Sequence, residues 1–281
     1  MTSSDEQTRD QQRDTWDRFS VGWRTWDAMV GAWLDPVGAA MLRQAHLRAD
    51  DRVLDVASGT GEPGLSAAAL VPTGRVTVTD LSQRMLAVAS ENAALRALRN
   101  VDALVCEAGA LPFEDAGFDA VLCRFGFMFF PNQSEAAAEL ARVARPGARV
   151  VAAVWSDPAD NPWATAIMTT IARYVAAPAP PPPAPGLFRC ASKGFLSRVF
   201  VQAGLREVSE HELSCDMLHD SPEQYWDFMT EVAAPVVAGL ATCDEAARGA
   251  IRAEVLSRAQ ASSHDGRVRM RSTATIVSGT R

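Results

Sequence analysis

The sequence is short of three features that would each place a protein in a special class: long apolar runs, clustered cysteines and a surplus of basic residues. No window comes near the ~18 apolar residues that a membrane-spanning helix requires, and the polar first 14 residues lack the apolar core of a signal peptide. The cysteines are five in number, widely spaced and without a CxxC or zinc-type pattern: Cys106, Cys123, Cys190, Cys215 and Cys243. We therefore expect a soluble cytoplasmic protein with reduced cysteines and no bound metal.

The charge balance is acidic, with 27 Lys and Arg residues against 34 Asp and Glu residues. A protein that binds a nucleic-acid backbone would need a basic stripe, and one that lies on a membrane surface would need a basic amphipathic helix. The sequence has neither, so we expect no nucleic-acid partner and no membrane partner. The length of 281 residues and the 48% share of hydrophobic residues suit one domain with a full core.

Between residues 50 and 155, short apolar segments alternate with segments of helical periodicity. Strands are expected at 52–57, 74–80, 101–108, 118–126 and 149–155, and later at 205–217 and 269–279. Helices are expected between the first five strands, at 63–70, 81–98 and 132–147. This alternation predicts an α/β fold, a Rossmann-like seven-stranded mostly parallel sheet with helices on both faces. Ligands of such sheets bind at the carboxyl ends of the strands.

The segment before this core is expected to cover it. Residues 1–14 are polar, which predicts a disordered tail. An aromatic stripe at helical spacing then predicts lid helices over 15–45: Trp16, Phe19, Trp23 and Trp26.

The segment after the core, 156–281, is expected to supply cap helices as well as the last strands. Helices are expected at 162–176, 193–203, 222–240 and 245–260. The proline-rich stretch 177–186 predicts a semi-rigid surface loop. No repeat or linker divides the chain, so we expect a single domain over 1–281 with its ligand-binding core at 50–155.

The most informative segment is the glycine turn VLDVASGTGEPG, residues 53–64. Gly59 and Gly61 permit a sharp turn between a strand and a helix, and the helix start offers free N–H groups to a ligand. The spacing from Gly59 to Gly64 also satisfies the dinucleotide fingerprint GxGxxG. However, Asp55 and Glu62 would repel a diphosphate and would suit a ligand with cationic groups, such as S-adenosylmethionine. A second acid, Asp80, ends the next strand.

Four blocks in this order and spacing resemble the class I S-adenosylmethionine-dependent methyltransferases: VLDVASGTG, VTVTDLSQRML, CEAGALPFEDAGFDAVLCRFGFMFF and ARVARPGARV. They are most similar to the small-molecule branch that includes the ubiquinone/menaquinone C-methyltransferase-like and type 11 enzymes. The resemblance covers residues 50–155, and the flanking segments match only in outline. It implies S-adenosylmethionine as cofactor and S-adenosylhomocysteine as product.

The resemblance also implies a set of cofactor-binding residues at the ends of the first four strands: Asp55, Ala57, Ser58, Gly59, Gly61, Asp80, Leu81, Met85, Glu107, Ala108, Cys123, Arg124 and Phe125. Asp80 would accept both ribose hydroxyls, Glu107 and Ala108 would bind the adenine edge, and residues 123–125 would line the sulfonium end. The chain departs from the family at Ala57, where glycine is usual and where we expect a negative φ. It departs also at Glu107, where aspartate is commoner.

The acceptor is expected to be a small aromatic or heteroaromatic metabolite, methylated at carbon, nitrogen or oxygen. The fourth strand lacks the Asn/Asp-Pro-Pro-Tyr run that grips planar amino groups in DNA and protein methyltransferases. Aromatic residues would instead bind the acceptor by stacking: Trp23, Trp26, Phe127, Phe129 and Trp155. The alanine- and arginine-rich composition is associated with bacterial specialised metabolism. We assign no catalytic base and leave the oligomeric state open.

Two other functions stay open from the sequence. A nicotinamide-dependent oxidoreductase would use the same glycine turn for a dinucleotide. A regulator that binds S-adenosylmethionine without catalysis would carry the same cofactor residues.

Overall fold

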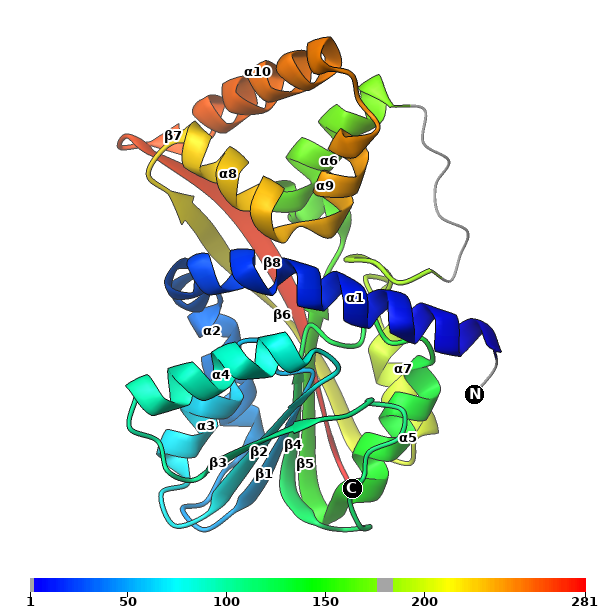
Figure 1. Ribbon diagram of the computed structural model, residues 1–281. Helices are drawn as coiled ribbons and strands as arrows, with labels where there is room; N and C mark the ends of the chain where they lie inside the picture. The colour runs from blue at the N-terminus through cyan, green and yellow to red at the C-terminus, as the bar shows by residue number, and fades with distance from the viewer. Residues whose placement is uncertain (1–2, 176–183) are drawn as a thin grey trace.

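A twisted eight-stranded sheet forms the centre of the protein in the computed structural model, which describes residues 3–175 and 184–281 (Figure 1). Five strands run parallel: β1 (Arg52–Val56), β2 (Arg75–Asp80), β3 (Val101–Val105), β4 (Phe118–Arg124) and β5 (Ala144–Trp155). Strand β8 (Arg267–Thr280) is antiparallel to β5 and to β6 (Arg206–His219). The strand order is β3-β2-β1-β4-β5-β8-β6.

The predicted mostly parallel α/β sheet is therefore confirmed, with one correction to its strand count. The eighth strand, β7 (Ser263–His264), is a two-residue segment that pairs only with β8. A two-residue strand carries no period-2 pattern, which is why the sequence predicted seven.

Helices cover both faces of the sheet (Figure 1). Helices α2 (Asp27–Ala45), α3 (Gly64–Leu70) and α4 (Gln83–Leu95) lie on one face, and α5 (Gln133–Val143) and α7 (Phe195–Gln202) lie on the other. The starts of α4 and α5 are fixed by capping side chains, since Ser82 accepts from Met85 N and Asn132 accepts from Ser134 N. Strands β1 and β4 are buried on both sides, as the centre of such a sheet requires.

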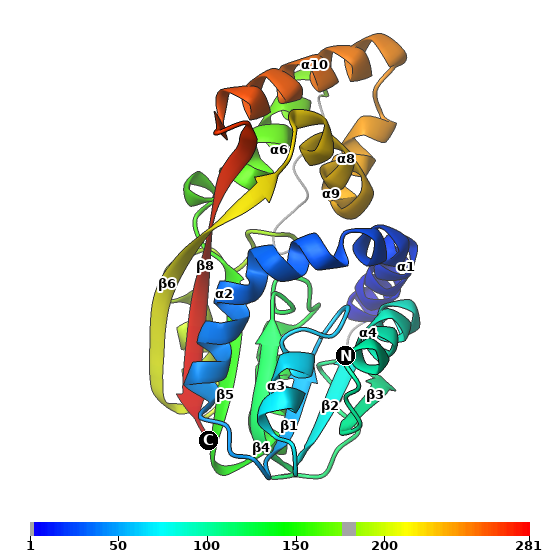
Figure 2. The same ribbon diagram turned by 90° about the vertical axis from the view of Figure 1, so that its left-hand side faces the viewer.

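A helical cap stands beyond the carboxyl ends of the parallel strands. It consists of α6 (Pro162–Tyr174), α8 (Pro222–Val232), α9 (Ala234–Ala241) and α10 (Glu245–Ala261). Strands β6 and β8 extend past the other strands and reach this cap, and the short helix η1 (Pro158–Asp160) connects β5 to α6 (Figure 2). The single helix expected at 222–240 is two helices, because a proline at 235 would clash with the carbonyl of Glu231 in a continuous helix.

The N-terminal helix α1 (Ser3–Thr25) crosses between the core and the cap (Figures 1 and 2). The prediction of a disordered tail over 1–14 is wrong for residues 3–14, which are helical. Polar residues there find partners that composition alone does not reveal: Arg9 pairs with Glu107, and Arg13 with Asp10. The expected surface loop at 177–186 lies outside the described residues except for its last three positions.

Candidate functional site

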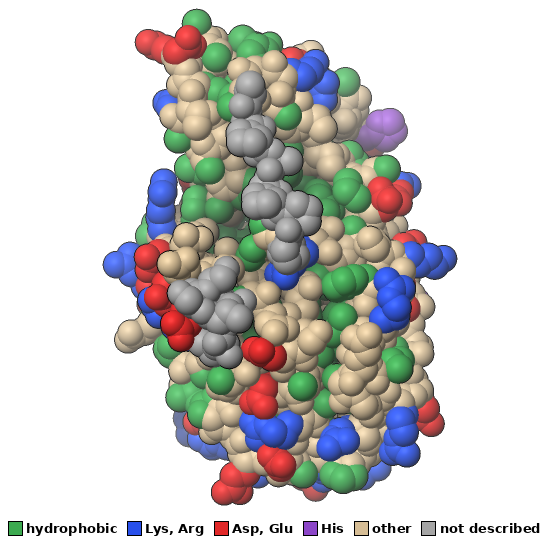
Figure 3. Space-filling model, turned by 90° about the vertical axis from the view of Figure 1, so that its right-hand side faces the viewer, with side chains coloured by type: hydrophobic (Ala, Val, Ile, Leu, Met, Phe, Trp, Pro, Cys, Tyr) green, Lys and Arg blue, Asp and Glu red, His purple; other side chains and the backbone are tan. Residues whose placement is uncertain are grey.

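A cavity of about 450 Å³ lies at the carboxyl ends of the parallel strands, beneath α1 and between the core and the cap. This volume falls in the range of small-molecule sites. Hydrophobic side chains gather between the cap and the core on the face shown in Figure 3. The cavity lies at the boundary between β1 and β4, where the strand order reverses and where ligands bind in sheets of this kind.

The glycine turn forms one end of the cavity through Ala57, Ser58 and Gly59. Gly59 has a φ of +56°, which glycine adopts without strain. Ala57 also has a φ of +56°, so the expected negative φ is wrong. The chain turns directly after β1 because Ser58 N donates to Thr79 O at 2.9 Å, and this bond holds Ala57 in a conformation that costs roughly 1–2 kcal/mol.

Asp55 and Gly61 support the turn from below and do not line the cavity. Asp55 is fully buried, and its Oδ2 accepts a hydrogen bond from Gly64 N at 2.7 Å. Burial raises the pKa of Asp55 to about 8, and the hydrogen bond from Gly64 opposes that rise. A Cβ on Gly64 would lie 2.8 Å from Oδ2, so only glycine permits this contact.

Asp80 lies at the end of β2 with its carboxylate at the cavity wall. Its Oδ2 accepts from Gly59 N at 3.0 Å and its Oδ1 from Ser82 N at 2.8 Å. Burial raises the pKa of Asp80, while these backbone N–H groups lower it. Each oxygen keeps a lone pair for a further donor, so the carboxylate can receive two hydroxyl groups of a ligand.

Four further residues of the predicted cofactor-binding set also line the cavity: Leu81, Met85, Glu107 and Ala108. The sequence analysis did not predict Arg9 of α1, which also lines the cavity and pairs with Glu107. The Arg9 guanidinium lies 3.2 Å from the Glu107 carboxylate. This ion pair connects α1 to the segment that follows β3. The 98-residue separation left no sequence signal for this pair.

The end of β4 supplies Arg124 and Phe125 to the cavity wall, whereas Cys123 lies fully buried behind it. Phe125 has a φ of +62° and stacks on Trp155, with ring centroids 4.1 Å apart. The guanidinium of Arg124 is desolvated, which lowers its pKa, while nearby carboxylates, Glu62 foremost, oppose that shift.

An aromatic wall forms the other end of the cavity. Trp33 of α2 lies at its centre, stacked on Trp155 at 5.4 Å and edge-on to Trp163 at 4.8 Å and Phe228 at 6.4 Å. Three of these residues, Trp33, Trp163 and Phe228, were not among the predicted site residues. Trp33 follows Trp26 by seven positions, a helical interval that could have indicated it.

The predicted acceptor residues divide into those that line the cavity and those that do not. Trp23, Phe129 and Trp155 line it. Trp26 does not, because its indole Nε1 donates to Glu231 at 2.8 Å and its ring packs on Phe228. Phe127 is fully buried in the core.

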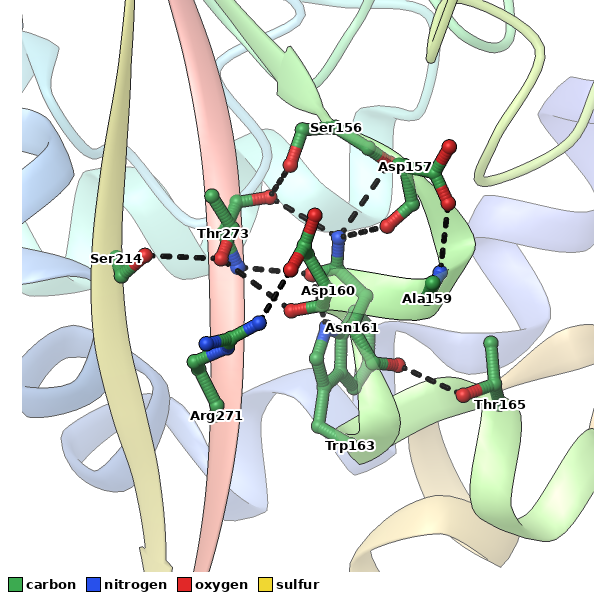
Figure 4. A network of polar contacts seen from close by, with 10 residues as sticks. All are labelled: Ser156, Asp157, Ala159, Asp160, Asn161, Trp163, Thr165, Ser214, Arg271 and Thr273. Atoms are coloured by element: carbon green, nitrogen blue, oxygen red, sulfur yellow. Dashed lines mark hydrogen bonds and ion pairs between the residues drawn. The ribbon is translucent and has the colours of Figure 1, made fainter.

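The side chain of Asn161 holds the aromatic wall in place (Figure 4). Its Oδ1 accepts from Trp163 Nε1 at 3.0 Å and from Thr273 N at 2.9 Å. Its Nδ2 donates to the carbonyls of Ser156, Asp157 and Thr273. Since Asn161 is fully buried, this network ties the start of α6 to β8 and fixes the direction of the Trp163 ring.

The residues around the cavity fit a polar ligand with an aromatic or apolar part. Ser58 Oγ and Trp23 Nε1 are buried and have no hydrogen-bond partner within the described part of the chain, and both residues line the cavity. Among the described residues, no group of three or more His, Cys, Asp and Glu side chains is placed to hold a metal ion. No helix in the described ranges has the length and apolar character to cross a membrane.

Comparisons with known proteins agree with this geometry. Residues 53–147 match the family model described as a methyltransferase domain. An uncharacterised protein of Mycobacterium tuberculosis is 38% identical over 123 residues, 44% of each chain. A ubiquinone/menaquinone biosynthesis C-methyltransferase of Burkholderia mallei is 39% identical over 114 residues, 40% of this chain and 46% of that protein. The match thus spans less than half the length of these relatives.

Solved structures show the same fold over more of the chain. The YcgJ protein of Bacillus subtilis aligns with a TM-score of 0.58 and 18% identity over 88% of this chain and 98% of that one. The cyclase SpnF aligns with a TM-score of 0.54 and 23% identity over 88% and 80%. The fold alone therefore does not define the reaction. Residues 53–147 therefore form a methyltransferase domain, and in this segment the chain is similar to the class I S-adenosylmethionine-dependent methyltransferases.

Proposed function

We propose that the protein transfers a methyl group from S-adenosylmethionine to a small aromatic or heteroaromatic metabolite. The observation that carries this proposal is the division of one cavity into two chemically different ends. One end presents the glycine turn and the Asp80 carboxylate. The other end presents aromatic faces from α2, β5 and α6, with Phe125 between the two.

The polar end supplies the groups that the cofactor needs. Asp80 would accept the two ribose hydroxyls, and the buried Ser58 hydroxyl would gain a partner on the methionine side. Leu81 and Met85 would pack on the adenine face, and Glu107 would accept at its edge. Asp55 would act indirectly, through its hydrogen bond to Gly64.

The cofactor supplies a methyl group activated by a positively charged sulfur. The contribution of the chain would be to hold the acceptor atom about 3–3.5 Å from that carbon and in line with the sulfur. Aromatic walls would exclude water and would favour the sulfonium cation by cation–π attraction. The acceptor electron pair would form the new bond to carbon, the sulfur would retain the pair of the broken bond, and the proton lost from the methylated atom would pass to the solvent. None of the described residues that line the cavity is a histidine, lysine or tyrosine, and the proposal assigns no catalytic base.

Isothermal titration calorimetry with S-adenosylhomocysteine and with NAD tests the cofactor assignment. We expect S-adenosylhomocysteine to bind and NAD not to bind. Asp80→Ala should weaken S-adenosylhomocysteine binding at least tenfold, because two charge-assisted hydrogen bonds are lost. Asp102→Ala is the matched control, since Asp102 lies exposed on β3 and pairs with Arg75 away from the cavity.

Three outcomes would contradict parts of the proposal. Tight NAD binding would favour an oxidoreductase, and equal affinities for the wild type and Asp80→Ala would remove the ribose role. Binding of S-adenosylmethionine without release of S-adenosylhomocysteine, over a broad set of small aromatic acceptors, would favour a regulator. A cytoplasmic location and a setting in bacterial specialised metabolism stay predictions.

A further inference from the structure

Arg124 places a positive charge at the boundary between the two ends of the cavity. It is the last residue of β4, and β4 lies between β1, which leads into the glycine turn, and β5, which ends at Trp155. Its side chain extends past α2, where an ideal Cβ on Gly38 would lie 3.8 Å from Arg124 Nη1. The residue lines the cavity and is partly buried.

The guanidinium of Arg124 makes no hydrogen bond and no ion pair with any residue in the described ranges. Four carboxylates lie near enough to influence it, those of Glu62, Asp55, Asp27 and Asp35, and none of them forms an ion pair or hydrogen bond with it in the described ranges. Glu62 forms an ion pair with Arg96 and also accepts from Ser66 N at 3.2 Å. Asp55 accepts from Gly64 N. A guanidinium has five N–H donors, so Arg124 has its full capacity left for an anion.

Of the other charged groups at the cavity wall, Arg9, Glu107 and Asp80 already have partners, whereas Glu135 forms no ion pair within the described residues. Arg9 pairs with Glu107, and Asp80 receives two backbone N–H groups. A desolvated cation without a partner is costly, and an anionic ligand group would remove that cost. Arginine suits a carboxylate best, because its planar fork donates two parallel hydrogen bonds.

Two indole N–H groups of the aromatic wall already donate to protein acceptors. Trp33 Nε1 donates to Ser272 Oγ at 2.8 Å, and Trp163 Nε1 donates to Asn161. The faces that these rings turn to the cavity are therefore purely apolar. A ligand ring stacked there would bring a substituent on its edge toward the end of β4, since Phe125 follows Arg124 directly and stacks on Trp155.

We propose that the acceptor is an aromatic acid, whose carboxylate is bound by Arg124 and whose ring packs against the wall formed by Trp33, Trp155 and Phe125. This inference rests on the proposed methyl transfer and narrows its acceptor class. Arg124 would then be a specificity residue that binds the acid group. Its position would determine where the acceptor ring lies relative to the cofactor.

Binding of 2-naphthoate and of its neutral isostere 2-naphthamide, to the protein saturated with S-adenosylhomocysteine, tests the inference. Quenching of tryptophan fluorescence gives the affinity. We expect the wild type to prefer the acid by about tenfold or more, the gain typical of hydrogen bonds to a charged group. Arg124→Met should abolish this preference, and Arg124→Lys should keep part of it. Arg75→Met is the matched control, because Arg75 lies exposed at the opposite end of β2, and it should leave the preference unchanged.

A second pair of ligands separates the acceptor from the cofactor as the source of the carboxylate. S-adenosylhomocysteine carries a carboxylate, and 5′-methylthioadenosine does not. If Arg124→Met weakens binding of the first and not of the second, the anion belongs to the cofactor and the inference is overturned. Equal affinity of the wild type for naphthoate and naphthamide, or no binding of either, would also overturn it. Failure of S-adenosylhomocysteine to bind the wild type would instead refute the proposed function.

Discussion

The buried carboxyl group of Asp55 stabilises the glycine turn through a hydrogen bond, and its burial makes the stability of the fold depend on pH. One of its oxygens receives Gly64 N, and the other, Oδ1, is buried without a hydrogen-bond partner in the described part of the chain. Desolvation of the charged form explains why the pKa rises to about 8. The bond to Gly64 needs only an acceptor oxygen, and a neutral side chain can supply one.

This arrangement predicts a pH-dependent effect of Asp55→Asn. In the unfolded chain the carboxyl group has the ordinary aspartate pKa of about 3.8, and in the folded protein its pKa is about 8. Between these values the native state holds the extra proton, so its stability falls as the pH rises, and above pH 8 the loss is complete. The variant lacks this loss. We expect its free energy of unfolding relative to the wild type to rise by about 1 kcal/mol or more from pH 5 to pH 8.5, measured by urea titration.

Circular dichroism at both pH values serves as the control that the variant keeps the native fold. The wild type and Asp55→Asn share every other titrating group, so the difference between their stabilities isolates position 55. A difference that does not change with pH would show that Asp55 is ionised in the folded protein throughout this range.

Individual residues of the site were predictable where they follow directly from a strand end. Gly59, Asp80 and Arg124 line the cavity because each lies at or just after the end of a buried strand that the apolar pattern marks. The sign of φ at Ala57 could not be predicted, since it depends on a bond to Thr79 on another strand. Phe127 lies two residues after Phe125 but is buried in the core, whereas Phe125 lines the cavity. The turn after β4 determines this difference, and the sequence does not reveal it.

At the scale of elements, side-chain contacts hold α1 against α4, an element that is distant from it in the sequence. Asp17 Oδ1 accepts from Ser82 Oγ at 2.5 Å and from Arg84 N at 3.4 Å. Arg24 pairs with Glu91 at 2.6 Å further along the same helix. These contacts hold α1 over the cavity, where Trp16 and Trp23 form part of its roof.

Asp17→Ala should loosen this roof. It leaves the Ser82 hydroxyl and the Arg84 N–H without their acceptor, a loss of roughly 1–2 kcal/mol. We expect faster hydrogen exchange of the α1 amides and about tenfold weaker binding of S-adenosylhomocysteine. Asp14→Ala, on the exposed side of the same helix, should change neither quantity. Unaltered exchange in Asp17→Ala would mean that hydrophobic packing alone holds α1.

The alternation of strands and helices from β1 to β5 was predictable because each element is long enough to show its own period. The extent of α1 was not. Helix α1 begins at Ser3 through polar contacts to distant elements, and no apolar stripe marks its first three turns. The break between α8 and α9 could have been predicted, because Pro235 cannot continue the helix that ends at Val232.

At the scale of the whole molecule, core and cap share two strands. Strands β6 and β8 pair continuously from Ser209↔Ser278 at the core to His219↔Val268 at the cap. The same two strands connect to β5 on one side and to the cap helices on the other (Figure 2). Unfolding of the cap would therefore expose the upper part of a sheet whose lower part lies in the core.

This continuity predicts one cooperative unfolding transition for core and cap. Tryptophan fluorescence reports the region that includes the junction, where Trp155 and Trp163 lie, and far-ultraviolet circular dichroism reports the whole chain, so the two signals should coincide during thermal unfolding. S-adenosylhomocysteine at about 100 times its Kd should stabilise the protein by about 2.7 kcal/mol and shift both signals together. In Asp80→Ala the same ligand concentration should give a clearly smaller shift. If only one signal moved with the ligand, the cap would unfold independently, and the shared strands would not couple the aromatic wall to the cofactor end.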